Sequence, residues 1–188
     1  MKLNEKAFLI YKLFNSSFTG LSIGILFTIY KPLEDPSIYS IGGMVLALGM
    51  LVIAKFYEKL LNIKSFFKIS LMVELIILLT LFIFIYLQYS ITSALLIYCG
   101  YQITFIFGGY LVRAETLVAQ NKELLGKIDI NKQIGYLFGL GCSYIFYKVL
   151  EIGFDISDSK IQISILHYFL MSLQSLIIFL LLRSFKYS

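Results

Sequence analysis

The sequence predicts an all-α, polytopic membrane protein with six transmembrane helices and both termini in the cytoplasm. Of its 188 residues, 59% are hydrophobic and only 14% are charged, whereas about a quarter of the residues in a soluble domain are charged. The hydrophobic residues gather in six long stretches, and most charged residues lie between them. These observations exclude an ordinary soluble globular domain.

The six apolar stretches follow one another with short connections: residues 8–30, 38–57, 65–87, 91–112, 133–152 and 162–182. Each is long enough, as a helix, to cross roughly 30 Å of hydrocarbon. We expect the first stretch to remain in the mature chain, because it is too long for a signal peptide and contains Asn15 and several hydroxyl residues. The prediction is one transmembrane domain over residues 1–188, with no room for a soluble catalytic domain.

The charges of the connections predict the orientation. The first, third and fifth connections are acidic or nearly uncharged: residues 31–37, 87–90 and 151–160. Of the 16 Lys and Arg residues, only Lys31, Lys148 and Lys160 lie on that side, and the other 13 lie on the opposite side. Because cytoplasmic connections carry the excess of Lys and Arg, we expect both termini in the cytoplasm and the chain in the inner (cytoplasmic) membrane. This orientation accounts for the net charge of +5, so no nucleic-acid partner is expected.

The fourth connection, residues 113–132, mixes apolar residues such as Leu117, Leu124 and Ile128 with charges. That composition is typical of an amphipathic segment. We expect it to lie along the cytoplasmic surface of the membrane, in contact with lipid.

Glu74 is the strongest single anomaly, because it lies roughly ten residues, or about 13 Å, into the third stretch. An ionised carboxyl at that depth costs several kcal/mol, so it must be neutral, paired or in contact with water. Two roles remain open. Glu74 is either a proton- or cation-coupling site or a protonated acid that hydrogen-bonds to a neighbouring helix.

His167, the only histidine, shares a helical face of the sixth stretch with Met171 and Gln174. Gln174 lies at about the same depth as Glu74, which predicts a hydrogen bond between them. His167 lies nearer the outside, and one histidine cannot form a metal site without other ligands. The options for His167 are a proton relay, a solute contact, a partner contact or a structural hydrogen bond.

Polar faces on the first and fourth stretches suggest a solute site. Asn15 and Thr19 share one face of the first stretch, and Tyr98 and Gln102 share one face of the fourth. Amide, hydroxyl and aromatic groups around a shared cavity would suit a small polar or amphipathic solute. The alternative is polar packing between helices.

Glycines predict close helix crossings. Gly135 and Gly139 form a Gly-x-x-x-Gly pattern in the fifth stretch, and Gly20 and Gly24 repeat that spacing in the first. Small residues at this spacing let two helix backbones approach.

No catalytic motif is found. The sequence contains no phosphate-binding loop, no metal-ligand cluster and no nucleotide fingerprint. We therefore expect neither catalytic residues nor a metal or other cofactor, and we expect no enzymatic activity.

Residues 108–143 resemble the corresponding region of the major facilitator superfamily, with Gln133, Gly135 and Gly139 at the opening of the fifth helix. Residues 54–64 resemble a loop motif of that family that has Gly, Asp-Arg, Gly and a basic end. Here these positions are occupied by Ala54, Glu58, Lys59, Leu61 and Lys64, so both glycines are replaced and the acid is longer. The resemblance implies one six-helix half of such a transporter. It also implies a conformational latch in which Glu58 meets Arg113.

A half-length member implies two halves around one cavity, and therefore a homodimer or a second membrane subunit. The leading hypothesis is a transporter protomer for a small solute, contacted by Asn15, Thr19, Tyr98 and Gln102, with Glu74 as the proton-coupling candidate. The alternative is a non-transporting scaffold, receptor or substrate-binding subunit that docks a larger complex through Glu74, His167 and Gln174.

Overall fold

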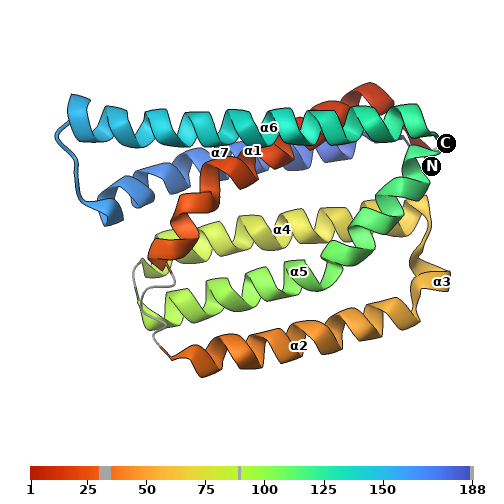
Figure 1. Cartoon of the computed structure of the whole chain (residues 1–188), viewed down its shortest axis with the longest axis horizontal. Helices are drawn as coiled ribbons and strands as arrows, with labels where there is room; N and C mark the ends of the chain where they lie inside the picture. Colours follow the sequence, from red (N-terminus) through yellow and green to blue (C-terminus); the bar gives the residue numbers. More distant parts are fainter. Residues whose placement is uncertain (30–34, 89, 187–188) are drawn as a thin grey trace.

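The computed structural model describes residues 1–29, 35–88 and 90–186, and these are helical apart from two short strands (Figure 1). The α-helices are α1 (Glu5–Ile29), α2 (Pro36–Lys55), α3 (Tyr57–Leu60), α4 (Ile63–Leu87), α5 (Ile91–Ala119), α6 (Lys122–Lys148) and α7 (Ser159–Arg183). A π-helical segment, η1 (Val149–Gly153), continues α6, and the strands are β1 (Lys2–Leu3) and β2 (Phe185–Lys186). Most of the first connection, residues 30–34 including Lys31, lies outside the described residues.

Polar side chains cap the helices where the apolar stretches begin. The side chains of Asn62, Ser90 and Asn121 accept hydrogen bonds from backbone amides in the first turns of α4, α5 and α6. Asp35 does the same for α2. Its carboxyl group accepts a hydrogen bond from the Ser37 backbone amide, and this bond lowers the pKa of Asp35. These caps satisfy helix-end donors that have no partner within the helix.

Four helices are long and apolar enough to cross a membrane: α2, α4, α5 and α7. They correspond to the second, third, fourth and sixth predicted spans. Helices α1 and α6, with 25 and 27 residues, are also long enough to cross a membrane, but their described parts are less apolar than those of the other four. The reason is visible in the sequence, because α1 contains Lys6 and Lys12 and the first turns of α6 are rich in charge. The chain therefore has the pattern of a multi-pass membrane protein, and four of its described helices have the length and composition of membrane spans.

The prediction of a surface segment at residues 113–132 is wrong. Helix α5 continues without interruption to Ala119, the chain turns at Gln120 with φ 60°, and α6 begins at Lys122. Leu124 and Ile128 are buried in the protein core, where they do not face lipid. An amphipathic pattern indicates one apolar face, but it does not distinguish a membrane surface from a neighbouring helix as the partner of that face.

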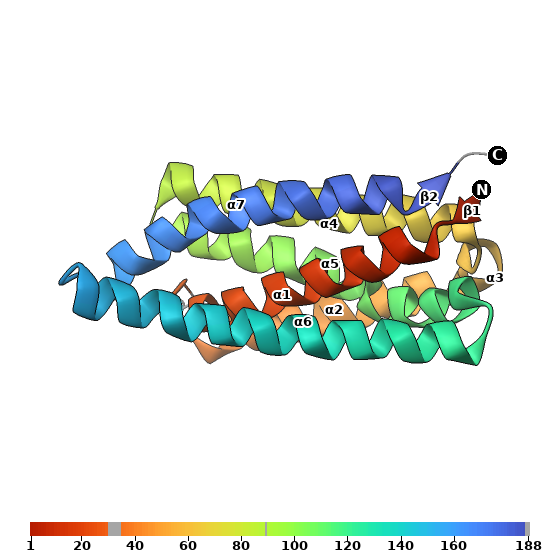
Figure 2. The ribbon, with the colours of Figure 1, turned by 90° about the horizontal axis from the view of Figure 1, so that it is seen from above.

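The helices form two three-helix units, which we call the α1 unit (α1, α6 and α7) and the α5 unit (α2, α4 and α5). Within the α1 unit, α1 packs against α6 and α7; within the α5 unit, α5 packs against α2 and α4. Helices α4 and α7 make the main contact between the units. Figures 1 and 2 show the units side by side, with α1 and α5 each between two helices.

The two units have matching contact patterns. If α1 is exchanged with α5, α2 with α6, and α4 with α7, each of these helix contacts maps onto another one or onto itself.

The α1–α6 crossing confirms the predicted glycine packing at Gly135, Gly139 and Gly20, whereas a Cβ atom at Gly24 would only touch the Tyr147 side chain at 3.8 Å. A Cβ atom added at Gly135 would overlap the carbonyl oxygen of Leu13, and one added at Gly139 would overlap that of Ser17. On the other helix, a Cβ at Gly20 would overlap the carbonyl oxygen of Tyr136. The two backbones therefore touch at positions where only glycine fits.

The two chain ends meet at one end of the molecule (Figure 1). Strands β1 and β2 are antiparallel, with Leu3 opposite Phe185, and the Asn4 backbone amide donates to the Ser184 carbonyl at 2.8 Å. Phe8, Phe66 and Phe67 surround the Phe185 ring with centroid distances of 5.1–6.1 Å. The α5–α6 turn and α3 lie at this same end, which we call the terminal end.

Candidate functional site

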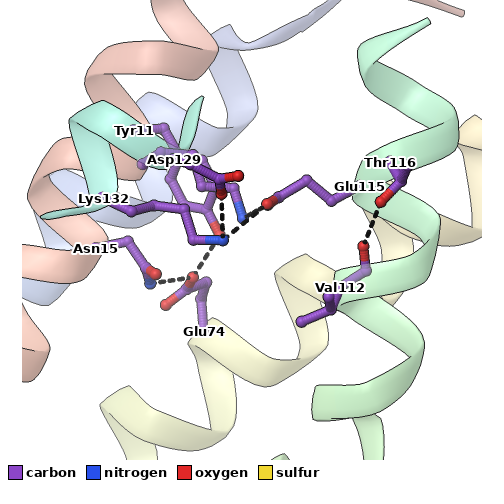
Figure 3. Close-up of polar contacts among 9 residues, drawn as sticks. Tyr11, Asn15, Glu74, Val112, Glu115, Thr116, Asp129 and Lys132 are labelled. Atoms are coloured by element: carbon purple, nitrogen blue, oxygen red, sulfur yellow. Dashed lines mark hydrogen bonds and ion pairs between the residues drawn. The ribbon is translucent and has the colours of Figure 1, made fainter. Parts of the chain in front are cut away.

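The candidate site is centred on Glu74, which is only 2% exposed where α4 meets the α1 unit (Figure 3). The Tyr11 hydroxyl and the Asn15 amide, both on α1, donate to Glu74 Oε1 at 2.7 and 2.8 Å. Gln174 on α7 donates through Nε2 to Glu74 Oε2 at 2.8 Å and to the Glu74 backbone carbonyl at 2.9 Å. The predicted hydrogen bond between Glu74 and Gln174 is therefore confirmed.

Both carboxyl oxygens of Glu74 take part in hydrogen bonds. Tyr11 and Asn15 contact one oxygen, and Gln174 contacts the other. The Gln174 amide is oriented by the Glu74 backbone, because rotating it would bring Gln174 Oε1 against two oxygen atoms. Gln174 Oε1 itself is buried and has no hydrogen-bond partner among the described residues. The Tyr11 hydroxyl can donate to a carboxylate or accept from a carboxylic acid, so this arrangement accommodates Glu74 in either protonation state.

A second carboxylate, Glu115 on α5, binds two lysines of the α1 unit. Lys12 of α1 forms an ion pair with Glu115 Oε2, and Lys132 of α6 binds Oε1 at 2.9 Å. Lys132 also lies 3.5 Å from Asp129 (Figure 3). Glu115 and Lys12 are buried, with exposed fractions of 4% and 9%.

Aromatic rings enclose the Lys12 ammonium. It lies 5.3, 5.4 and 5.9 Å from the ring centroids of Phe8, Tyr11 and Phe66. Tyr11 and Asn15, which bond Glu74, lie on either side of Lys12 in the same turn of α1. The two carboxylates are therefore connected through this turn of α1 as one polar cluster between the units.

His167 does not join this cluster. Its Nδ1 lies 2.8 Å from the carbonyl oxygen of Ile163, one turn earlier on α7, and its ring stacks on Phe84 of α4 with a centroid distance of 3.8 Å. Among the options predicted for His167, these contacts favour the structural one. Glu74, His167 and Gln174 are all at most 2% exposed, so they are not available as docking residues for a partner.

The four predicted solute residues lie in two separate places. Asn15 is engaged with Glu74, and the Thr19 hydroxyl donates to the Asn15 backbone carbonyl at 3.3 Å on an exposed part of α1. Tyr98 and Gln102 instead line an apolar groove of about 390 Å³ between α2 and α5. The structure therefore does not assemble one solute site from these residues within this chain.

The groove between α2 and α5 depends on another glycine. A Cβ at Gly42 would overlap the hydroxyl of Tyr98, whose ring packs edge-on against Tyr39 at 5.6 Å. Gln102 Oε1 is buried and has no hydrogen-bond partner among the described residues.

The predicted latch also differs from the observed contact. Arg113 donates to the Tyr57 hydroxyl at 3.1 Å and lies 5.3 Å from the centre of the Tyr57 ring. No ion pair between Arg113 and Glu58 is found in the described part of the chain. Arg113 therefore contacts the residue directly before Glu58 in α3, and not Glu58 itself.

Sequence reasoning missed Tyr11, Lys12, Glu115 and Lys132. Lys12 carried a usable signal, because a lysine inside an apolar stretch needs a partner just as Glu74 does. Glu115 and Lys132 carried none, since both fall in the charged connection where ion pairs cannot be assigned from spacing. Among the described residues, no three His, Cys, Asp or Glu side chains come together as a metal site requires.

The fold and this cluster define an all-helical, multi-pass membrane protein with a buried polar centre between two three-helix units. No family model, no curated protein and no solved structure matches the chain.

Proposed function

We propose that this chain is a membrane transporter protomer that moves a small solute, with Glu74 as its proton- or cation-coupling residue. The observation that carries the proposal is the position of Glu74, which is 2% exposed and held by α1 and α7 from the opposite unit. Secondary transporters place coupling groups where their repeats meet near the bilayer midplane. Ionisable groups inside membrane helices usually have functional roles.

The exchange that maps the helix contacts onto one another relates α1, α2 and α4 to α5, α6 and α7, which are two consecutive sets of three helices. This correspondence supports the proposal, because the halves of major facilitator transporters are built from three-helix repeats. One such half needs a second half to enclose a cavity. We propose a homodimer or a pairing with another six-helix subunit, in which a solute meets the combined surface of the two halves. The separation of Asn15 and Thr19 from Tyr98 and Gln102 agrees with a cavity completed by a second half.

A flux assay tests this proposal. Purified protein is placed in proteoliposomes containing a trapped pH dye, and a panel of labelled amino acids, sugars, nucleosides and organic cations is screened for uptake driven by a proton gradient. For any solute taken up, Glu74→Gln should reduce the rate at least tenfold, because it removes the titratable group while leaving the fold intact. Glu151→Gln, at a half-exposed ion pair with Lys148, is the matched control and should retain the rate. An unchanged rate in Glu74→Gln would reject the assignment.

A non-transporting membrane subunit is the second candidate, and the exposure of α2 favours it. Met44 and Leu48 on α2 are 60% and 65% exposed, and α2 packs mainly against α5. Gentle extraction from native membranes separates the two candidates by mass. A particle with twice the 21.6 kDa chain mass favours the dimeric transporter, whereas defined additional polypeptides favour the subunit.

A further inference from the structure

The ion pairs of Glu115 join three helices that otherwise have little contact across the two units. Glu115 belongs to α5, Lys12 to α1 and Lys132 to α6. Glu115 lies near the end of α5, and the two lysines lie in the first halves of α1 and α6, so the ion pairs form toward the terminal end. The α4–α7 contact supplies most of the helix packing between the units, and α5 and α6 meet only weakly. Any movement that separates α1 and α6 from α5 must break both ion pairs of Glu115.

Burial makes these ion pairs cooperative. Glu115 and Lys12 have little access to water, and the aromatic rings around Lys12 exclude it further. A buried charge that loses its partner without gaining water pays a large desolvation cost. The cluster should therefore be either closed with both lysines on Glu115 or open with all three side chains hydrated.

One turn of α1 links this cluster to Glu74. Tyr11 and Asn15 donate to Glu74, and Lys12, between them in sequence, pairs with Glu115. Residues four apart on a helix lie on one face, so these three side chains move together with α1. Lys12 pairs with Glu115, while Tyr11 and Asn15, on either side of Lys12 in the sequence, hold Glu74 against the same turn of α1.

We propose that Lys12, Glu115 and Lys132 form a charge clamp that holds the two units together at the terminal end, and that neutralising Glu74 tightens this clamp. When Glu74 is charged, its negative charge lies beside the turn of α1 that carries Lys12, in addition to the charge of Glu115. When Glu74 is neutral, Glu115 is the only carboxylate left for Lys12. The clamp rests on the observed ion pairs, whereas its control by a proton on Glu74 rests on the proposed function.

The charged and titratable groups around the clamp come from each helix packed against it. Helix α1 presents Tyr11 and Lys12 to Glu74, and α7 presents the amide of Gln174, which does not titrate. Helix α6 presents Lys132 to Glu115, and Asp129 of the same helix contacts Lys132. Glu74 is therefore the acidic group on α4 that changes the balance of charge around Lys12.

A double-mutant cycle on the purified, full-length protein tests the clamp without any flux measurement. Lys12→Met, Glu115→Gln and the double variant are compared by melting temperature, first in the wild-type background and then in Glu74→Gln. Glu115→Gln leaves the buried Lys12 without its ion-pair partner, and Lys12→Met removes one of the two lysines that neutralise the buried Glu115. Each single change should therefore lower the melting temperature by about 5 °C or more. The double variant should lose much less than the sum. The same cycle on the exposed Glu123–Lys127 pair is the control and should show near-additive, small effects.

The coupling between Lys12 and Glu115 should be larger in the Glu74→Gln background than in the wild type. Additive losses for Lys12→Met and Glu115→Gln would overturn the clamp, and equal coupling in both backgrounds would overturn its control by Glu74. If Lys12→Met does not fold, the cycle is run with Lys132→Met, because Lys132 is more exposed. The two proposals can fail separately. If the coupling between Lys12 and Glu115 depends on Glu74 but Glu74→Gln does not change the flux, the proposed transport is rejected and the clamp is supported.

Discussion

At the scale of single residues, Glu74 illustrates how a buried carboxyl is made tolerable inside an apolar helix. Three donors from two other helices satisfy it, and Lys12 supplies a nearby positive charge. Depth counting alone predicts the bond to Gln174, because the two residues are similarly far from the ends of antiparallel helices. The contacts with Tyr11 and Asn15 could not be predicted, since they depend on how α1 is rotated about its axis.

Replacing Glu74 by Leu should destabilise the protein more than replacing it by Gln. Leucine leaves the Tyr11 hydroxyl and the Asn15 amide without their acceptor, at a cost of about 1–3 kcal/mol for each unsatisfied group, whereas Gln174 keeps the backbone carbonyl of residue 74. Glutamine keeps one acceptor oxygen and should cost about half as much. Chemical unfolding in detergent micelles measures both. Equal stability of Glu74→Leu and the wild type would show that these hydrogen bonds contribute nothing.

At the scale of helices, the α1–α6 pair shows what sequence patterns can and cannot establish. The Gly-x-x-x-Gly spacing predicts a close crossing, and the structure has one, because backbone contact requires the absence of a side chain. The amphipathic pattern of residues 113–132 was assigned to a membrane surface, and the structure instead extends α5 and begins α6 there. A pattern identifies the apolar face of a helix, whereas the partner of that face depends on tertiary packing.

The glycine contacts give a prediction with a control on the same helix. Gly135→Ala and Gly139→Ala should each destabilise the protein by about 2 kcal/mol or more, since the added methyl group overlaps the α1 backbone and forces the helices apart. Gly141→Ala has no atom within 4 Å of the new methyl group, so it should be neutral or slightly stabilising through helix propensity. Thermal unfolding of the three variants compares them. Similar losses at all three positions would mean that helix propensity, and not packing, governs this region.

At the scale of the whole molecule, the two three-helix units and the shared position of the termini give the chain its organisation. The charge distribution predicts that the terminal end is cytoplasmic, and the structure places both termini, α3 and the α5–α6 turn together there. The contact pattern of the units could not be predicted, because it depends on which helices pack together across long sequence separations. Single-sequence patterns locate helices and their ends far better than they order helices in space.

Orientation and the crossing by α6 can be tested together by cysteine labelling. Cys99 and Cys142 are first replaced by Ser, and single cysteines are then introduced at Lys122 and Asp155. Both positions are exposed: Lys122 is the first residue of α6, and Asp155 follows η1, which continues the other end of α6. A membrane-impermeant maleimide applied to right-side-out vesicles should label position 155 and not position 122. A helix of 27 residues spans about 40 Å, enough to separate the two positions by a bilayer. Labelling of both positions from outside would contradict a membrane crossing by α6.

Infrared spectroscopy can measure whether Glu74 gains and loses a proton inside the membrane protein. Difference spectra of the protein in lipid, recorded while the pH of the medium is changed, report the carbonyl stretch of protonated carboxyl groups. A buried-carboxyl band should rise as the pH falls, be absent in Glu74→Gln and be retained in Glu151→Gln. A band that Glu74→Gln leaves unchanged, or no titrating buried band at all, would rule out proton exchange at Glu74.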